Sequence, residues 1–129
     1  MALIVQKYGG TSVGDLERIE RVAERVKATR EAGNDVVVVL SAMGGETDRL
    51  LDLARQVGGK ACGRELDVLL ATGEQVSIAL LCMTLARNGC AARSFTGGQA
   101  RIRTDTSHTR RASRTSTWTL SRERSPIPK

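Results

Sequence analysis

Aromatic residues are almost missing from this sequence: Tyr8, Phe95 and Trp118 amount to 2% of its 129 residues. Hydrophobic residues as a class still make up 40%. We therefore expect a core built from Val, Leu, Ile and Ala. A surface for stacking nucleic-acid bases is not expected, because such surfaces are made of aromatic side chains.

Long apolar runs and metal-ligand patterns are missing as well. No run approaches the length of a transmembrane helix and no signal peptide is evident, so we expect a cytoplasmic protein. The three cysteines, Cys62, Cys82 and Cys90, show no CxxC spacing. We expect reduced thiols, two of them packed on or near helices. The single histidine, His108, is expected to be a solvated loop residue, and no metal site is predicted.

Basic residues are in excess, but only at one end of the chain. The net charge is +6, yet residues 1–100 hold 12 basic and 12 acidic residues, and residues 101–129 hold 8 and 2. A small nucleic-acid-binding protein that works through this basic end is therefore an alternative, with salt-sensitive, non-specific affinity. The charge-neutral, aromatic-poor remainder argues against it, and we expect neither a nucleic-acid nor a membrane partner.

Apolar periodicity predicts alternating strands and helices. The expected strands cover 2–6, 36–40 and 90–95 in one sheet, with a short fourth strand at Ile102, and the expected helices cover 15–32, a segment around 50–54, 64–71 and 75–87. We expect Gly58-Gly59 to end the second helix and Thr72–Glu74 to interrupt the chain between the last two. The unbroken run Val36–Leu40 is typical of a parallel strand covered on both faces. This order indicates an α/β fold with a mainly parallel sheet.

The segment Leu3–Gly14, LIVQKYGGTSVG, combines the parts of a phosphate site. Lys7 supplies a cation at the end of a strand, and Gly9 and Gly10 let the backbone approach a ligand closely. Thr11 or Ser12 can cap the next helix, whose N-terminus favours an anion. The lysine precedes the glycines, so this is not a Walker A loop. The alternative is a tight turn with a surface lysine.

Three loops are expected at one edge of the sheet. Residues 7–12, 41–48 and 96–99 each follow a predicted strand. In open α/β sheets, ligands bind beyond the carboxyl ends of the strands. These loops are therefore the predicted binding edge.

Four motifs lie along the chain in a fixed order: QKYGGTSVG at 6–14, GNDVVVVLSAMGGETDRL at 33–50, RELDVLLATGEQVSIALL at 64–81 and SFTGGQARIRTD at 94–105. With them the sequence closely resembles the aspartate kinase family of the amino-acid kinase superfamily. The resemblance implies the carbamate kinase-like fold, a three-layer sandwich with a mainly parallel sheet, of which this chain holds the N-terminal part.

The resemblance also implies roles for individual residues. It assigns Lys7 to catalysis and to ATP phosphates, and it adds Gly9, Gly10 and Ser41 to the phosphate site. The loop Gly45, Glu46, Thr47 and Asp48 is assigned to the amino-acid substrate. Glu74 is assigned to the ammonium group of aspartate, and a capping or surface glutamate is the alternative there. ATP and Mg²⁺ are the implied cofactors, with no metal ligand in this chain.

The implied activity is ATP-dependent phosphorylation of the β-carboxylate of L-aspartate to 4-phospho-L-aspartate. This is the first step of lysine, threonine and methionine biosynthesis. The implied partners are aspartate and ATP, with a homo-oligomer for the full-length family. Another member of the superfamily, acting on glutamate, carbamate or a nucleotide, is the alternative.

Residues 111–129 depart from the family. We expect 1–110 to be a partial amino-acid kinase domain and 111–129 to be a disordered basic tail rich in Ser, Thr and Arg. One hypothesis is a frameshift: a coding sequence for the family-like A-R-I-E-D-I-D-V-D-A, read after loss of its first base, gives R-A-S-R-T-S-T-W-T-L, the sequence of Arg111–Leu120. Sequencing the gene tests it. Such a truncated chain is expected to be inactive, with aliphatic surface exposed near Val36–Leu40 and along 75–87.

Overall fold

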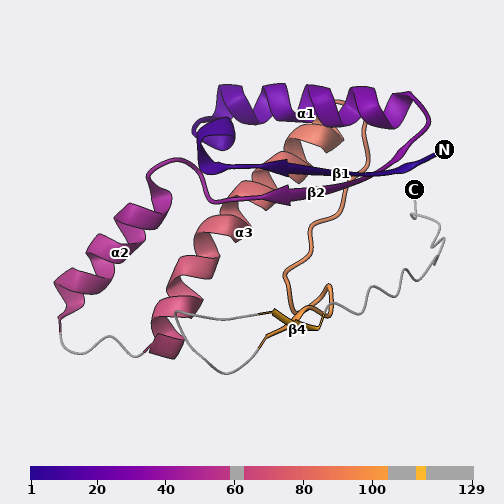
Figure 1. The fold of residues 1–129 in the computed structure, drawn as a ribbon. Coiled ribbons are helices and arrows are strands. Elements are labelled where there is room, and N and C mark those ends of the chain that lie inside the picture. The colour runs from indigo at the N-terminus through magenta and orange to yellow at the C-terminus, as the bar shows by residue number, and fades with distance from the viewer. Residues whose placement is uncertain (59–62, 105–112, 116–129) are drawn as a thin grey trace. The chain divides into compact units, whose positions relative to one another are not determined.

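The computed structural model describes residues 1–58, 63–104 and 113–115. They fall into two compact units, Met1–Ser94 and Phe95–Lys129. The first unit contains, in chain order, β1 (Leu3–Tyr8), a 3₁₀ turn η1 (Gly10–Val13), α1 (Leu16–Glu31), β2 (Asp35–Leu40), α2 (Glu46–Val57) and α3 (Gly63–Arg87) (Figure 1). Strands β1 and β2 pair in parallel, with Leu3 opposite Asp35 and Tyr8 opposite Leu40. The predicted α/β class and parallel pairing are confirmed.

The hydrophobic core of this unit lies where α1, α3 and one face of the sheet meet. Helix α1 contributes Ile19, Val22, Ala23 and Val26, and α3 contributes Leu81 and Leu85. Leu16 at the start of α1 is exposed. Alternate strand residues pack against this cluster: Tyr8, Val36, Val38 and Leu40. The core is aliphatic apart from Tyr8, as the composition predicts.

The opposite face of the sheet is open. Leu3, Val5 and Val39 are 49%, 63% and 47% exposed. Side chains alternate along a strand, so these odd-numbered residues point away from the core that α1 and α3 share. The prediction that Val36–Leu40 is covered on both faces is therefore wrong for the part of the chain that is described. The predicted exposure of aliphatic surface near this strand is confirmed.

Helix α3 is continuous over 25 residues, so the predicted break at Thr72–Glu74 is wrong. Gly73 lies inside the helix and is buried. A Cβ at this position would lie 3.1 Å from Ala42 Cβ and 3.4 Å from Leu50 Cδ1. The glycine therefore serves close packing rather than a turn.

Helix α3 is also long and apolar enough to cross a membrane, by length and composition alone. Its mean hydropathy over an 18-residue window is 1.7, and the expectation that no such run exists is wrong by this measure. In the described unit, however, one face of α3 packs against α1 and α2. Val76 and Met83 on α3 remain exposed, as predicted for this helix.

The start of α1 differs from the prediction. The N-cap of α1 is Asp15, whose Oδ1 accepts from the backbone N–H of Arg18 at 2.8 Å. Thr11 and Ser12 lie in η1 and do not cap this helix. The N-cap of α2 is Gly45.

Residues 90–95 are irregular, so the predicted third strand is wrong. The segment contains no β-branched residue, which leaves its strand propensity weak. In the second unit, β3 (Arg103–Thr104) begins one residue after the predicted strand position at Ile102, and it pairs antiparallel with β4 (Ser113–Thr115). Strand β4 falls within the segment predicted to be disordered. The rest of that tail, His108 and Cys62 lie outside the described residues.

Candidate functional site

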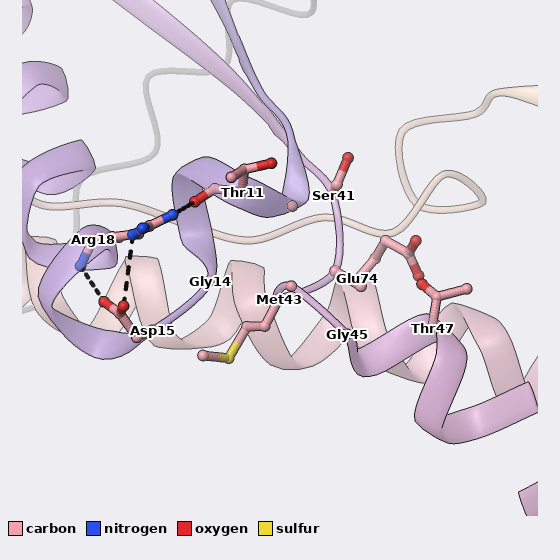
Figure 2. A pocket seen from close by; sticks show the side chains of 12 residues that line it. Thr11, Gly14, Asp15, Arg18, Ser41, Met43, Gly45, Thr47 and Glu74 are labelled. Atoms are coloured by element: carbon pink, nitrogen blue, oxygen red, sulfur yellow. Dashed lines mark hydrogen bonds and ion pairs between the residues drawn. The ribbon is translucent and has the colours of Figure 1, made fainter. Parts of the chain in front are cut away.

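A pocket of about 690 Å³ opens at the carboxyl ends of β1 and β2. Figure 2 shows side chains from the loops after both strands and from α1, α2 and α3 around it. The lining residues are Gly10, Thr11, Gly14, Asp15, Arg18, Ser41, Ala42, Met43, Gly44, Gly45, Thr47 and Glu74. The structure thus brings together five of the predicted site residues: Gly10, Ser41, Gly45, Thr47 and Glu74.

The floor of the pocket is backbone packed on backbone. The Ser41 N–H donates to the Tyr8 carbonyl at 3.1 Å, which extends the strand pairing into the loops. A Cβ on Gly10 would lie 3.0 Å from the Ala42 carbonyl oxygen, and a Cβ on Gly44 would lie 3.5 Å from the Gly10 carbonyl oxygen. A side chain at Gly10 would therefore press on the backbone of the neighbouring loop.

The loop after β2 turns into α2 through a left-handed residue. Gly45 has φ of +79°, a conformation that L side chains rarely adopt. The Glu46 carboxylate accepts from Arg49 at 2.7 and 2.9 Å, and these hydrogen bonds lower the pKa of Glu46. Thr47 follows with its side chain at the pocket, whereas Glu46 and Asp48 are not among the lining residues.

Helix α3 brings Glu74 to the opposite wall. Figure 2 shows the Glu74 carboxylate and the Thr47 hydroxyl pointing toward each other, with Ser41 on the adjoining loop. One turn later, the fully buried Ser77 donates a hydrogen bond to the Ser41 carbonyl at 2.8 Å. The helix is thereby joined to the loop after β2.

Arg18 and Asp15 line the pocket, and sequence reasoning did not place them there. Arg18 Nη1 donates to the Thr11 carbonyl at 2.5 Å, and Arg18 Nε lies 3.6 Å from Asp15 Oδ2. Figure 2 shows this side chain reaching across from α1 to the turn after β1. A signal was available, because an N-cap aspartate followed three residues later by arginine places both groups on one helical turn.

Lys7 and Gly9 are not among the lining residues of this pocket. Lys7 is an odd-numbered residue of β1, so its side chain lies on the open face of the sheet, where it is exposed. Its Nζ lies 3.8 Å from the position that a Cβ on Gly9 would take. The ammonium group is therefore beside the glycine turn, at the same end of β1.

The chemistry of the pocket suits a small zwitterion next to an anion. Glu74 offers a carboxylate for an ammonium group, and Ser41 and Thr47 offer hydroxyls. The glycine floor leaves room for backbone contact with a phosphoryl group, and Lys7 and Arg18 are cations nearby. Throughout the described ranges, no group of three or more His, Cys, Asp or Glu side chains could hold a metal ion.

The sequence matches the model of the amino acid kinase family over residues 2–127. It is 66% identical over 108 residues to an aspartate kinase of Pseudomonas putida, covering 84% of this chain and 26% of that protein. It is 60% identical over 108 residues to an aspartokinase of Mycobacterium tuberculosis, again covering 84% and 26%. The chain thus spans about a quarter of the length of these relatives.

A solved structure shares the fold. The crystal structure of an aspartate kinase from Synechocystis aligns with a TM-score of 0.73 and 58% sequence identity. The alignment covers 76% of this chain and 17% of that chain.

Proposed function

The chain belongs to the amino acid kinase family, and from this premise we propose that it is the N-terminal, aspartate-binding part of an aspartate kinase. The reaction would transfer the γ-phosphoryl group of ATP to the β-carboxylate of L-aspartate. Soluble biosynthetic kinases of this kind act in the cytoplasm, and we propose the same location here. A homo-oligomer of the complete subunit is part of the same proposal.

The observation that carries this proposal is the pocket at the strand ends. It places the Glu74 carboxylate opposite a loop that offers the Ser41 and Thr47 hydroxyls. An α-ammonium group needs a fixed anion, and Glu74 lines the pocket from helix α3. Aspartate bound there would have its ammonium at Glu74, and its reacting carboxylate would lie toward the glycine turn.

The phosphoryl group would then lie near the glycine turn and Lys7. Phosphoryl transfer depends on positioning and on stabilising charge on the transferred group. Backbone close to Gly10 would approach the phosphate oxygens, and the Lys7 ammonium would stabilise their charge from the end of β1. Bound Mg²⁺ would neutralise further charge on the phosphates. Its ligands are not assigned to this part of the chain.

Aspartate binding to the purified chain tests the substrate assignment. We expect saturable binding of L-aspartate by calorimetry, and Glu74→Gln should weaken it about 10- to 100-fold, because a charge-assisted hydrogen bond is lost. Glu65→Gln is the matched control, since Glu65 lies in the first turn of the same helix and pairs with Arg64. Equal binding by Glu74→Gln, or preference for L-glutamate, would refute the assignment.

A chimera tests the reaction. Residues 1–94 of this chain would replace the corresponding segment of the Pseudomonas putida aspartate kinase, and ATP-dependent aspartyl phosphate would be measured as its hydroxamate. We expect activity, and Lys7→Ala should lower kcat by about 100-fold with a smaller change in the KM for aspartate. A chimera that is folded but inactive would contradict the proposal.

A further inference from the structure

Ser77 is an unusual residue for the centre of an apolar helix. It is fully buried, and it is the one polar side chain among the buried residues that the structure describes. A buried hydroxyl costs free energy unless it is hydrogen-bonded. Its partners therefore show what the residue does in this fold.

The Ser77 hydroxyl has two carbonyls within reach. Its Oγ lies 2.8 Å from the Ser41 oxygen and 3.0 Å from the Glu74 oxygen. The second contact is the local bond that serine commonly makes within a helix. The first joins residues 36 positions apart and connects α3 to the loop after β2. A hydroxyl carries one proton, and the shorter distance favours Ser41 as its acceptor.

The surroundings of this hydrogen bond leave little room for adjustment. One turn earlier, Gly73 brings the backbone of α3 against Ala42, the residue after Ser41. Ala42 itself is buried. Because protein interiors are close-packed, a shift of α3 along its axis would break both contacts together.

From these contacts we propose that Ser77 is a positioning residue that sets the Glu74 carboxylate in register with the Ser41–Gly45 loop. The proposal rests on the proposed function only for the identity of the ligand. Ser77 is outside the lining of the pocket, but Glu74, three positions before it, and Ser41, whose carbonyl it binds, both line the pocket. It would act on the ligand through these two residues.

The test compares Ser77→Ala with Thr84→Ala in the full 129-residue chain. Thr84 lies two turns further along α3, and its hydroxyl donates at 2.8 Å to the Leu80 carbonyl within the helix. The readouts are the ¹³C′ shift of Ser41, ¹⁵N relaxation over Ala42–Gly45, and the Kd for L-aspartate. Ser77→Ala should move the Ser41 shift, increase loop motion and weaken aspartate binding by about 2- to 10-fold. Thr84→Ala should leave all three readouts unchanged.

The outcomes separate this proposal from its alternatives. A merely structural role would lower stability in both variants without moving the Ser41 signal, and that result overturns the proposal. If Ser77→Ala does not fold, Ser77→Cys retains a weak donor of similar shape and should give an intermediate Ser41 shift. An unchanged shift in that variant also overturns it. If the unaltered chain binds no aspartate, the proposed function fails, and the Ser41 shift and loop relaxation alone decide the positioning role.

Discussion

Gly73 shows how a single missing Cβ sets the distance between a helix and its neighbours. It lies inside α3, where glycine is normally unfavourable relative to alanine by about 1 kcal/mol. A Cβ built on Gly73 would lie close to Ala42 and Leu50, and this explains why glycine is used there. At this position the packing cost of a methyl group competes with the gain in helix propensity.

Gly73→Ala should therefore destabilise the protein although it improves helix propensity. The added Cβ would lie 3.1 Å from Ala42 Cβ, and the buried Ala42 backbone cannot move aside freely. We expect a net loss of about 1 to 2 kcal/mol in the free energy of unfolding, measured in urea. Thr72→Ala, at an exposed neighbouring position, is the control. A stabilised Gly73→Ala would show that the loop adapts.

The same glycine also shows what cannot be predicted for a single residue from the sequence. The glycine in Thr72–Glu74 favours a turn when only its neighbours in sequence are considered. Its close packing against the loop after β2 is visible only in the structure. The family resemblance named Gly10, Ser41, Thr47 and Glu74 as site residues, and all four line one pocket. The pocket position of Arg18 was not predicted: the spacing pairs it with Asp15, but the sequence does not show that its guanidinium donates to the Thr11 carbonyl of another element.

At the level of helices and strands, α1 and the end of α3 are held together by one charged cluster. The Glu20 carboxylate accepts from Asn88 Nδ2 at 2.8 Å and also from Arg87. The hydrogen bond from Asn88 lowers the pKa of Glu20 most, burial opposes this effect, and the hydrogen bond and charge of Arg87 lower the pKa further. A pKa lowered by folding means that the ionised form stabilises the native state.

Glu20→Gln should thus lower the melting temperature in a pH-dependent way. The contribution of Glu20 is fully present above its unfolded pKa, near 4.5, and is lost as the pH falls through its lower folded value. The difference in Tm between the unaltered chain and the variant should be largest at neutral pH and should vanish in strong acid. Glu24→Gln on the same helix is the control. A difference independent of pH would exclude this electrostatic origin.

Elements with strong periodicity were predicted well, and those that depend on neighbours were not. Helix α1 and strand β2 carry their signal within a few residues, so the predicted bounds lie within a residue of those observed. Residues 90–95 contain no β-branched side chain, and no described strand pairs with them. They therefore lack both features that favour a strand. Whether the second face of the sheet is covered likewise depends on which elements pack against it. The apolar periodicity of a strand cannot predict this.

At the scale of the whole molecule, the open sheet face predicts self-association. Leu3, Val5 and Val39 form an aliphatic face on a two-stranded sheet. Exposed apolar surface of this kind promotes association. Replacing Val5 and Val39 by threonine should shift the sedimentation profile toward monomer, and Val57→Thr, exposed at the end of α2, should not. If both variants associate equally, the surface responsible for self-association lies elsewhere.

The 129-residue polypeptide on its own should not phosphorylate aspartate. Transfer requires both substrates held in line with charge around the γ-phosphoryl group. The described residues supply the proposed aspartate pocket and cations next to one turn, but no grouped metal ligands. Aspartyl phosphate formation by the purified polypeptide, free of other kinases, would contradict this expectation, and the chimera described above is the positive control.

The contact between α1 and the far end of α3 also constrains how the chain folds during synthesis. Strand β2 ends at Leu40, so β1 and β2 can pair early, with α1 packed on them. The buried face of α1 is completed only when Leu81 and Leu85 have been added. At translation speeds of 5–20 residues per second, the ribosome needs about 2 to 9 seconds to add those residues. During that interval Ile19 and Val26 are only partly covered, and a nascent-chain chaperone would have time to bind them.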